Sequence, residues 1–332
     1  SARCAELGTA GYSYLARDLN QPSLSVSRLA NQETVTRRIT NVGEESESYT
    51  VEISPPPGID VNVTPPTITL GPGTSATFDV TLTYASGPMD LWRFGALTWV
   101  SEDHDVRSAI AVKPTSITAP KEIVSLGGTG SKTFAVEFGY NGSYRPGVHG
   151  LNLPHIESGF VDNDPSKTFT RRTNNGVTQH VLIVAQDQLF LRFSLFDALT
   201  DGDDDLDMYV YYCGLDGTAC SRIGESGEPT SEEQFNLYRP APGVYGVYVH
   251  GFQTDEVSGG PGSNYQLLAW SFGNVDDKGN MTATGPAFVS AGTTADITIN
   301  WSGLLSSTIY LGGISHNTPQ GLSELTLVTI GN

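Results

Sequence analysis

The chain has 332 residues, of which 36 are acidic and 18 are basic, and its formal net charge is -18 at pH 7. This charge argues against nucleic-acid partners, because their phosphates would be repelled at every approach. The length is large for one domain and suits three sandwiches of about 100 residues each. Turns rich in Gly and Pro separate short runs of Val, Thr, Ile, Phe and Tyr, which predicts an all-β fold of tandem β-sandwiches.

Residues 1–22 precede the first predicted strand and include Cys4, which has no partner nearby in the sequence. They lack the apolar core of a signal peptide. No apolar run in the chain approaches the roughly 20 residues that a membrane helix needs, so no membrane span is expected. If the protein is secreted, which suits its acidic composition, we expect its signal peptide upstream of this sequence.

One strand pattern occurs twice along the chain. The segment 61–112, from VNVTPPTITL to RSAIAV, aligns with the segment 281–330, from MTATGPAFV to TLVTI. The segment 25–53 has its counterpart at 122–151, well upstream of that second copy. The predicted domains are therefore residues 23–117, a discontinuous second domain of residues 118–158 and 274–332, and an inserted domain of residues 159–273. Sandwich domains tolerate such insertions at loop tips, since their termini are often neighbours.

The inserted segment contains strands with one apolar face. In LFLRFSLFD, one set of alternating residues is wholly apolar and the other is mixed: Leu189, Leu191, Phe193 and Leu195 against Phe190, Arg192 and Ser194. This period of two predicts a strand that buries one largely apolar face.

Five aspartates crowd the turn TDGDDDLDMY of the inserted segment: Asp201, Asp203, Asp204, Asp205 and Asp207, with Asp197 just upstream. Oxygen ligands on a flexible turn that contains Gly suit a hard cation, and calcium tolerates irregular geometry better than magnesium. We predict a calcium site formed by Asp201, Asp203, Asp205 and Asp207. The alternative is a solvated acidic loop, because the spacing departs from the EF-hand loop and lacks its distal Glu.

Cys213 and Cys220 bracket a Gly-rich turn in MYVYYCGLDGTACSRI. A hairpin at this turn would bring the two side chains together, so we predict a disulfide between them. Two buried free thiols are the alternative.

Four tyrosines lie on strands that should be neighbours, namely Tyr209, Tyr211, Tyr245 and Tyr248, with Trp270 on a third strand. Core packing is the default interpretation of such aromatic residues. An exposed aromatic platform that binds sugar or peptide is the functional alternative.

Four motifs of the first domain, DLNQPSLSV, VTRRITNVG, SPPPGIDVNVTPPTITL and GALTWVSEDHDVRSAIAV, carry a family resemblance. This domain resembles the fibronectin type III-like domain that follows the catalytic domain in plant-type subtilisin-like serine proteases. Gln21 stands where that family usually has Tyr, and Ala109 stands where it usually has Pro. The inserted segment, in HVLIVAQDQLFLRFSLFDA, DGDDDLDMYVYYC and PAPGVYGVYVHGFQTD, resembles the pre-peptidase C-terminal domain of secreted bacterial proteases.

These resemblances imply two fibronectin type III-like sandwiches, with a jelly-roll domain inserted in the second. They also imply the non-catalytic C-terminal region of a secreted subtilisin-like serine endopeptidase. Residues 1–22 would be the linker from the upstream catalytic domain, which the region would stabilise outside the cell while holding protein substrate near it.

The sequence itself offers no catalytic triad. A subtilisin-like site needs a nucleophilic serine on a Gly-Thr-Ser turn, a histidine base and an orienting aspartate, and this context is absent. The six histidines are scattered without metal-ligand spacing: His104, His149, His155, His180, His250 and His316. The rival interpretations are a carbohydrate-binding or adhesive module and an independent hydrolase, which would need a concave pocket.

Overall fold

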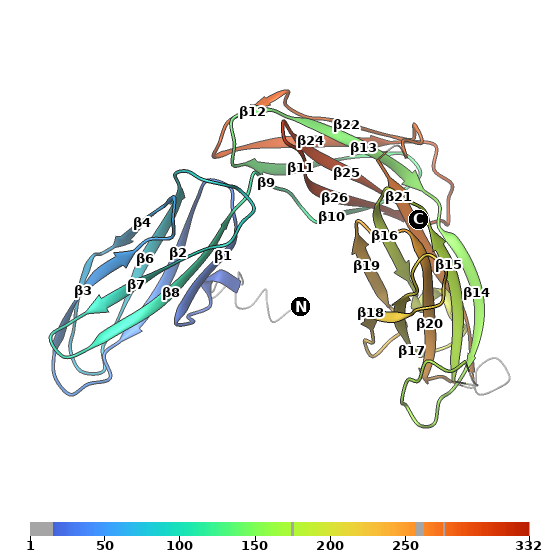
Figure 1. Cartoon of the computed structure of the whole chain (residues 1–332), viewed down its shortest axis with the longest axis horizontal. Helices are drawn as coiled ribbons and strands as arrows, with labels where there is room; N and C mark the ends of the chain where they lie inside the picture. Colours follow the sequence, from blue (N-terminus) through green and yellow to red (C-terminus); the bar gives the residue numbers. More distant parts are fainter. Residues whose placement is uncertain (1–15, 174–175, 256–261, 275, 332) are drawn as a thin grey trace.

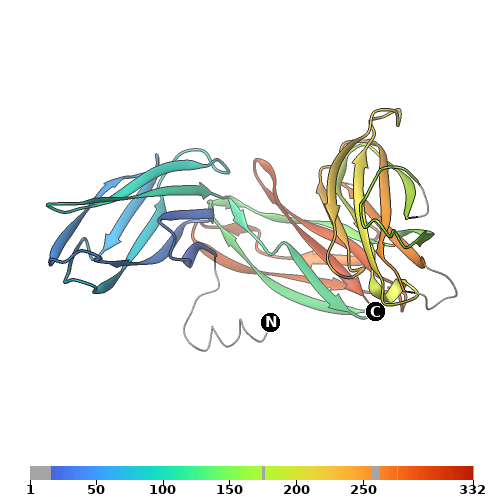
Figure 2. The same cartoon turned by 90° about the horizontal axis from the view of Figure 1, so that it is seen from below.

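The computed structural model describes residues 16–173, 176–255, 262–274 and 276–331. In this part the chain is all-β apart from two short 3-10 helices, η1 (Ala16–Asp18) and η2 (Asp197–Leu199). Figure 1 shows three sandwiches arranged as an arch, with the second sandwich across the top, and Figure 2 shows the same arrangement from below. Most of the predicted linker, including Cys4, lies outside the described residues.

The first sandwich contains β1 (Ser23–Leu29), β2 (Gln32–Thr40), β3 (Glu47–Ser54), β4 (Ile59–Thr64), β5 (Thr67–Leu70), β6 (Ser75–Tyr84), β7 (Arg93–Val100) and β8 (Asp105–Pro114). Its sheets have the strand orders β1-β8-β7-β3-β5 and β2-β6-β4. Along β6, Phe78, Val80 and Leu82 point inward, because alternate residues of a strand face opposite sides. Trp99 of β7 packs edge-on against Phe78, with ring centroids 5.0 Å apart.

The second sandwich is built from two separate stretches of the chain. Its strands are β9 (Ile117–Thr118), β10 (Glu122–Leu126), β11 (Gly130–Phe138), β12 (Gly142–Ser143), β13 (Arg145–Asn152), β22 (Met281–Thr284), β23 (Phe288–Val289), β24 (Thr293–Trp301), β25 (Tyr310–Thr318) and β26 (Gly321–Gly331). They form the sheets β10-β26-β25-β13 and β22-β24-β11-β9 and the small pair β12-β23. β11 pairs with β24 from Gly130↔Trp301 to Phe138↔Thr293. β10 is parallel to β26, as β1 is parallel to β8, so the two sandwiches share a strand arrangement.

The inserted domain lies between those two stretches. Its strands are β14 (His155–Asp162), β15 (Val177–Val184), β16 (Gln188–Ser194), β17 (Asp205–Tyr212), β18 (Ser221–Ser226), β19 (Gln234–Tyr238), β20 (Gly243–Gln253) and β21 (Gly262–Gly273). They form the sheets β14-β21-β16-β19 and β15-β20-β17-β18. Side chains such as Phe193, Met208 and Val247 fill the space between them.

Two domain boundaries differ from those that the sequence predicts. β14 begins at His155 and pairs with β21 from His155↔Ala269 onward, so the inserted domain starts before residue 159. Ile117 of β9 pairs with Phe138 of β11, which places it in the second sandwich rather than the first. In both cases strand pairing, which sequence similarity does not detect, sets the domain edge.

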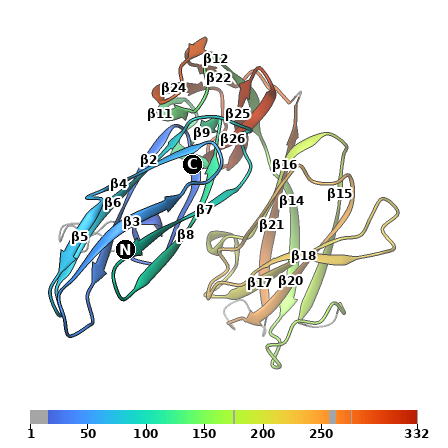
Figure 3. The ribbon, with the colours of Figure 1, turned by 60° about the vertical axis from the view of Figure 1, so that its left-hand side comes forward.

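The inserted domain packs sheet β14-β21-β16-β19 against sheet β10-β26-β25-β13 of the second sandwich (Figure 3). The apolar part of this interface consists of Leu189, Phe190, Leu268, Trp270, Phe272, Leu311, Leu325 and Leu327. Buried Arg192 crosses the interface, and its two terminal nitrogens donate to the Glu122 carboxylate, each at 2.8 Å. β16 is therefore covered on both faces, although its sequence indicates one largely apolar face.

Candidate functional site

The acidic turn before β17 spreads its carboxylates in different directions. Both oxygens of Asp201 accept hydrogen bonds from Asn264, at 2.9 and 2.7 Å. Buried Asp204 accepts from the backbone N–H of Asp255 at 3.0 Å and from the hydroxyl of Ser263 at 2.7 Å. Within the described ranges, no three His, Cys, Asp or Glu side chains are placed to hold a metal ion together. Calcium at this turn stays a prediction, and it would need donors other than the four predicted carboxylates acting together.

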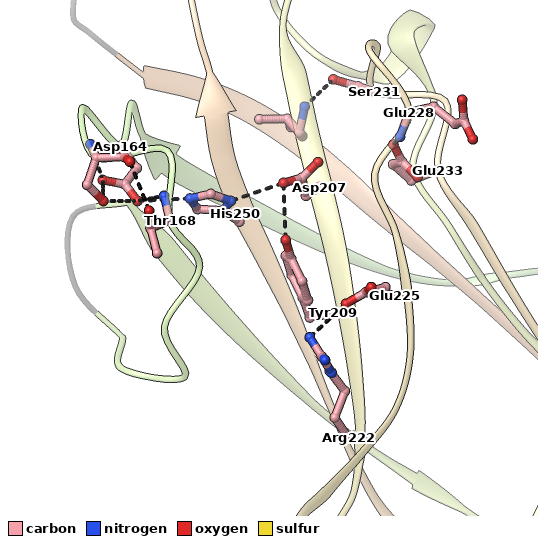
Figure 4. A network of polar contacts seen from close by, with 12 residues as sticks. Asp164, Thr168, Asp207, Tyr209, Arg222, Glu225, Glu228, Ser231, Glu233 and His250 are labelled. Carbon is pink, nitrogen blue, oxygen red and sulfur yellow. Dashed lines mark hydrogen bonds and ion pairs between the residues drawn. The ribbon is translucent and has the colours of Figure 1, made fainter.

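Asp205 and Asp207 face outward from the sheet β15-β20-β17-β18, whereas Asp197 accepts from the backbone N–H of Ser231 at 2.7 Å. Asp205 and Asp207 share one face of β17, because they are two residues apart. Asp207 accepts from His250 of the neighbouring β20, and the Tyr209 hydroxyl donates to the same oxygen at 3.4 Å. These contacts begin a polar network on the outer face of the sheet (Figure 4).

His250 lies between two carboxylates at the centre of that network. Its Nε2 is 2.9 Å from Asp164 Oδ2 and its Nδ1 is 3.2 Å from Asp207 Oδ2. Both bonds require N–H donors, so the ring is protonated. Burial alone would lower the pKa of His250, but the hydrogen bonds to Asp207 and Asp164 outweigh it and raise the pKa. Only 1% of the residue is exposed, so it acts as a structural cross-link rather than as a general base.

Asp164 anchors the segment of residues 163–173, called the strap below, to the sheet. Burial opposes the charged form of Asp164, but the hydrogen bonds from His250, Ser166 and Thr168 hold its pKa at about 2. Further along the strap, the ring of Phe169 stacks on Tyr209, with centroids 3.7 Å apart and planes inclined by 7°. The strap therefore covers part of the outer face of the sheet.

The predicted tyrosine platform is divided between the two faces of the sheet. Tyr245 and Tyr248 are three residues apart on β20, so they point to opposite sides, and Tyr245 is buried in the core. Tyr209 and Tyr211 share the outer face with Tyr248, which is also buried. The four rings therefore do not form one exposed row. Trp270 lies in the interface with the second sandwich.

A cavity of about 380 Å³, called the acidic pocket below, opens beside the strap. Its lining includes the carboxylates of Asp205, Asp207, Glu225 and Glu228 and the rings of Tyr209 and Phe252. The run of aspartates in the sequence indicates two of these acids but not the two glutamates, which come from β18 and from the loop that follows it. Strand order β17-β18 brings the two groups together.

Serine, histidine and a carboxylate do meet elsewhere, at one end of the first sandwich, but not in catalytic order. The hydroxyl of Ser101 donates to Glu47, and Nδ1 of His104 is 3.0 Å from the same Glu47 oxygen. A nucleophilic serine needs the histidine, not the carboxylate, as its immediate acceptor. Hydrogen bonds from Ser101, Tyr49 and His104 instead hold the pKa of Glu47 at about 2.

The sulfur atoms of Cys213 and Cys220 are joined in a disulfide at the end of β17. The bridge closes the turn that leads to β18 and so fixes one end of the hairpin that supplies Glu225 to the acidic pocket.

Comparison with known proteins assigns a class to the first sandwich. Residues 18–112 match the family model described as fibronectin type-III domain. Relatives of the chain include subtilisin-like proteases of the plant Arabidopsis thaliana. Subtilisin-like protease SBT2.6 is 44% identical over 81 residues, which is 24% of this chain and 10% of that protein. The CO(2)-response secreted protease is 37% identical over 106 residues, which is 31% of this chain and 14% of that protein.

The first sandwich is thus a fibronectin type-III domain, and the chain matches only about a tenth of the length of the subtilisin-like proteases to which it is similar. Among solved structures, the secreted serine protease VesC from Vibrio cholerae aligns with 77% of this chain and 49% of its own, at 11% identity and a TM-score of 0.23. A score this low supports no likeness of fold. No helix in the described part of the chain is long and apolar enough to cross a membrane.

Proposed function

We propose that the chain is the non-catalytic C-terminal region of a secreted subtilisin-like serine endopeptidase. The observation that carries this proposal is the match of residues 18–112 to a fibronectin type-III domain, together with the similarity of the chain to subtilisin-like proteases. The arrangement of Ser101, Glu47 and His104 agrees with a region that does not itself cleave peptide bonds.

The role of the region in this proposal is to stabilise the catalytic domain and to hold protein substrate near it. The buried apolar interface between the second sandwich and the inserted domain holds the two together, so the region would act as a rigid support for the catalytic domain and not as a flexible tail. A carbohydrate-binding role receives less support, because the strap covers part of the aromatic face and Tyr245 lies in the core. Calcium binding at the acidic turn forms part of the proposal.

The test compares the parent protease with a version that ends before residue 16. Fresh samples of the two should cleave a short peptide at similar rates, whereas the truncated enzyme should lose activity several-fold faster at elevated temperature. Equal half-lives would contradict the stabilising role. The isolated chain should not hydrolyse casein, and hydrolysis that a serine-directed inhibitor blocks would contradict the non-catalytic assignment.

A further inference from the structure

The acidic pocket gathers negative charge against aromatic walls. Asp205 and Asp207 of β17 face Glu225 and Glu228 across a space of about 380 Å³, with the rings of Tyr209 and Phe252 beside them. Asp205 and Asp207 are two residues apart on one face of β17, so their like charges are crowded together. Arg222 balances one of these acids, through an exposed ion pair with Glu225 at 2.7 Å.

Glu233 adds a second observation behind the pocket wall. The residue is only 1% exposed, and its Oε2 has no hydrogen-bond partner among the described residues. Its other oxygen accepts from the backbone N–H of Glu228 at 2.7 Å. Figure 4 shows the side chain beside the backbone of Glu228, which lines the pocket. Burial raises the pKa of Glu233 to about 7, so a cation placed in the pocket would favour its ionised form.

The lining suits an organic cation better than a metal ion. No three acidic side chains in the described part of the chain converge closely enough to share a metal. The aromatic rings of Phe252 and Tyr209 can instead attract a flat guanidinium or an ammonium group through their faces. Carboxylates spread around such rings match the several N–H donors of an arginine or lysine side chain.

The strap already shows how such a segment lies on this face. The ammonium group of Lys167 is 4.6 Å from the centroid of the Phe252 ring and donates to Gln253 at 2.9 Å. Phe169, two residues after Lys167, stacks on Tyr209. The guanidinium of Arg171, two residues after Phe169, lies 5.6 Å from the centroid of the Tyr211 ring. The strap turns at Lys167, whose φ is 49° and whose N–H donates to the carbonyl of Asp164, and it then places every second side chain against the sheet.

We propose that the acidic pocket and the adjoining aromatic face bind a polypeptide segment in which basic residues alternate with an aromatic one, and that the strap is an own-chain segment of this kind. The charge of the partner follows from the charge of the pocket, and its spacing follows from Lys167, Phe169 and Arg171. This inference rests on the substrate-holding part of the proposed function and names the class of polypeptide held.

The test uses the isolated chain and a fluorescent synthetic peptide with the sequence of residues 164–173, DPSKTFTRRT. Binding is followed by fluorescence anisotropy at low salt. The double variant K167S/F169S, which weakens the strap's own hold on the face, should bind the peptide about tenfold more tightly than the unaltered chain. Adding D205N/E228Q to that variant should weaken binding about tenfold, since two pocket carboxylates are lost.

The matched control adds E44Q/E45Q instead, which removes two exposed charges from the first sandwich. This variant should bind the peptide as tightly as K167S/F169S alone. Equal binding by the pocket variant and the control, or equal binding of a peptide with Gln at each basic position, would overturn the proposal. Displacement of the peptide by micromolar calcium would assign the pocket to a metal instead.

The outcome is separable from that of the proposed function, because the binding assay contains no protease domain. Loss of peptide binding with an unchanged effect on protease half-life would overturn this inference alone. An unchanged half-life together with peptide binding through the pocket would overturn only the stabilising role.

Discussion

The second sandwich and the domain inserted into it each bury two histidines, and one of each pair, His316 and His250, lie in opposite surroundings. In the second sandwich, Nε2 of His316 is 2.8 Å from the Thr326 hydroxyl, which itself donates to the carbonyl of Pro120 at 2.7 Å. The hydroxyl must therefore accept from Nε2–H, and Nδ1 accepts from the hydroxyl of Tyr144 at 2.6 Å. This ring is neutral, whereas His250 in the inserted domain is protonated between two carboxylates.

The two histidines reflect a difference in where the two regions place their charges. The second sandwich keeps its interior uncharged, and burial lowers the pKa of His316 to about 4. The inserted domain gathers charge on one sheet face, where the strap, His250 and the acidic pocket meet. In the proposed function, the second sandwich would support the catalytic domain and the inserted domain would bind polypeptide.

The largest expected effect concerns the ion pair that joins the two regions. Replacing Arg192 by Met should cost about 4 kcal/mol, because Glu122 would be left without its buried partner. Guanidinium unfolding followed by tryptophan fluorescence measures this loss. The control is R222M, which removes an exposed pair and should cost less than about 0.5 kcal/mol. Equal losses in both variants would show that the junction does not depend on the buried pair.

Acid should weaken the second sandwich through His316. The pKa of His316 is lowered in the folded state, so the unfolded chain binds more protons at pH values between about 6.5 and about 4. Stability should therefore fall by about 3 kcal/mol as the pH drops through this window. His250 has a raised pKa, so its contribution is fully present in the window and is lost only as the pH rises through that pKa.

The variant H316Q isolates this effect. Its unfolding free energy should depend less steeply on pH between pH 6.5 and pH 4 than that of the unaltered chain. The control H155Q, which changes an exposed histidine, should keep the original slope. An unchanged slope in H316Q would assign the acid sensitivity to other groups.

Calcium should act on the inserted domain only. If the acidic turn binds calcium, a free concentration of 100 times the Kd adds about 2.7 kcal/mol to folded stability. The melting temperature should rise with calcium and fall with chelator, and the variant D203N/D205N should lose this response. A melting curve that ignores chelator after verified metal removal would favour the solvated-loop interpretation.

The disulfide should have the smallest of these effects. In the chain-entropy model a bridge across so short a loop contributes about 2.5 kcal/mol, so C213S/C220S should lower the stability of the inserted domain by that amount. Thiol titration of the denatured, non-reduced chain should find one free group, on Cys4. Three reactive thiols would exclude the bridge.

Local patterns in the sequence predict the all-β class and the strands of the core. The alternation around Leu191 and Phe193 gives the inward face of β16, because a period of two depends on neighbouring residues alone. The other face, with Phe190 and Arg192, depends on a strand that begins at residue 122, so local sequence cannot show what covers it. The sequence is sufficient to predict that Tyr245 and Tyr248 point to opposite faces of their strand, because they are an odd number of residues apart.

The polar network around His250 could not be predicted from the sequence, for a different reason. Asp207 and His250 are 43 residues apart, and Asp164 and His250 are 86 apart. No local spacing connects these residues, and only the strand order of the sheet makes them neighbours. The acidic turn was visible because its charges are contiguous, but contiguous charges do not reveal which oxygens are turned toward backbone donors.

The most direct test of the division between the two regions is to titrate both histidines by NMR. In a chain labelled with nitrogen-15 histidine, with H316Q and H250Q used for assignment, the signal of His316 should titrate well below its ordinary pKa of 6.5 and that of His250 above it. His316 should show the neutral Nε2–H tautomer at pH 7, while His250 shows the imidazolium. The reverse order, or two unshifted titrations, would contradict the account.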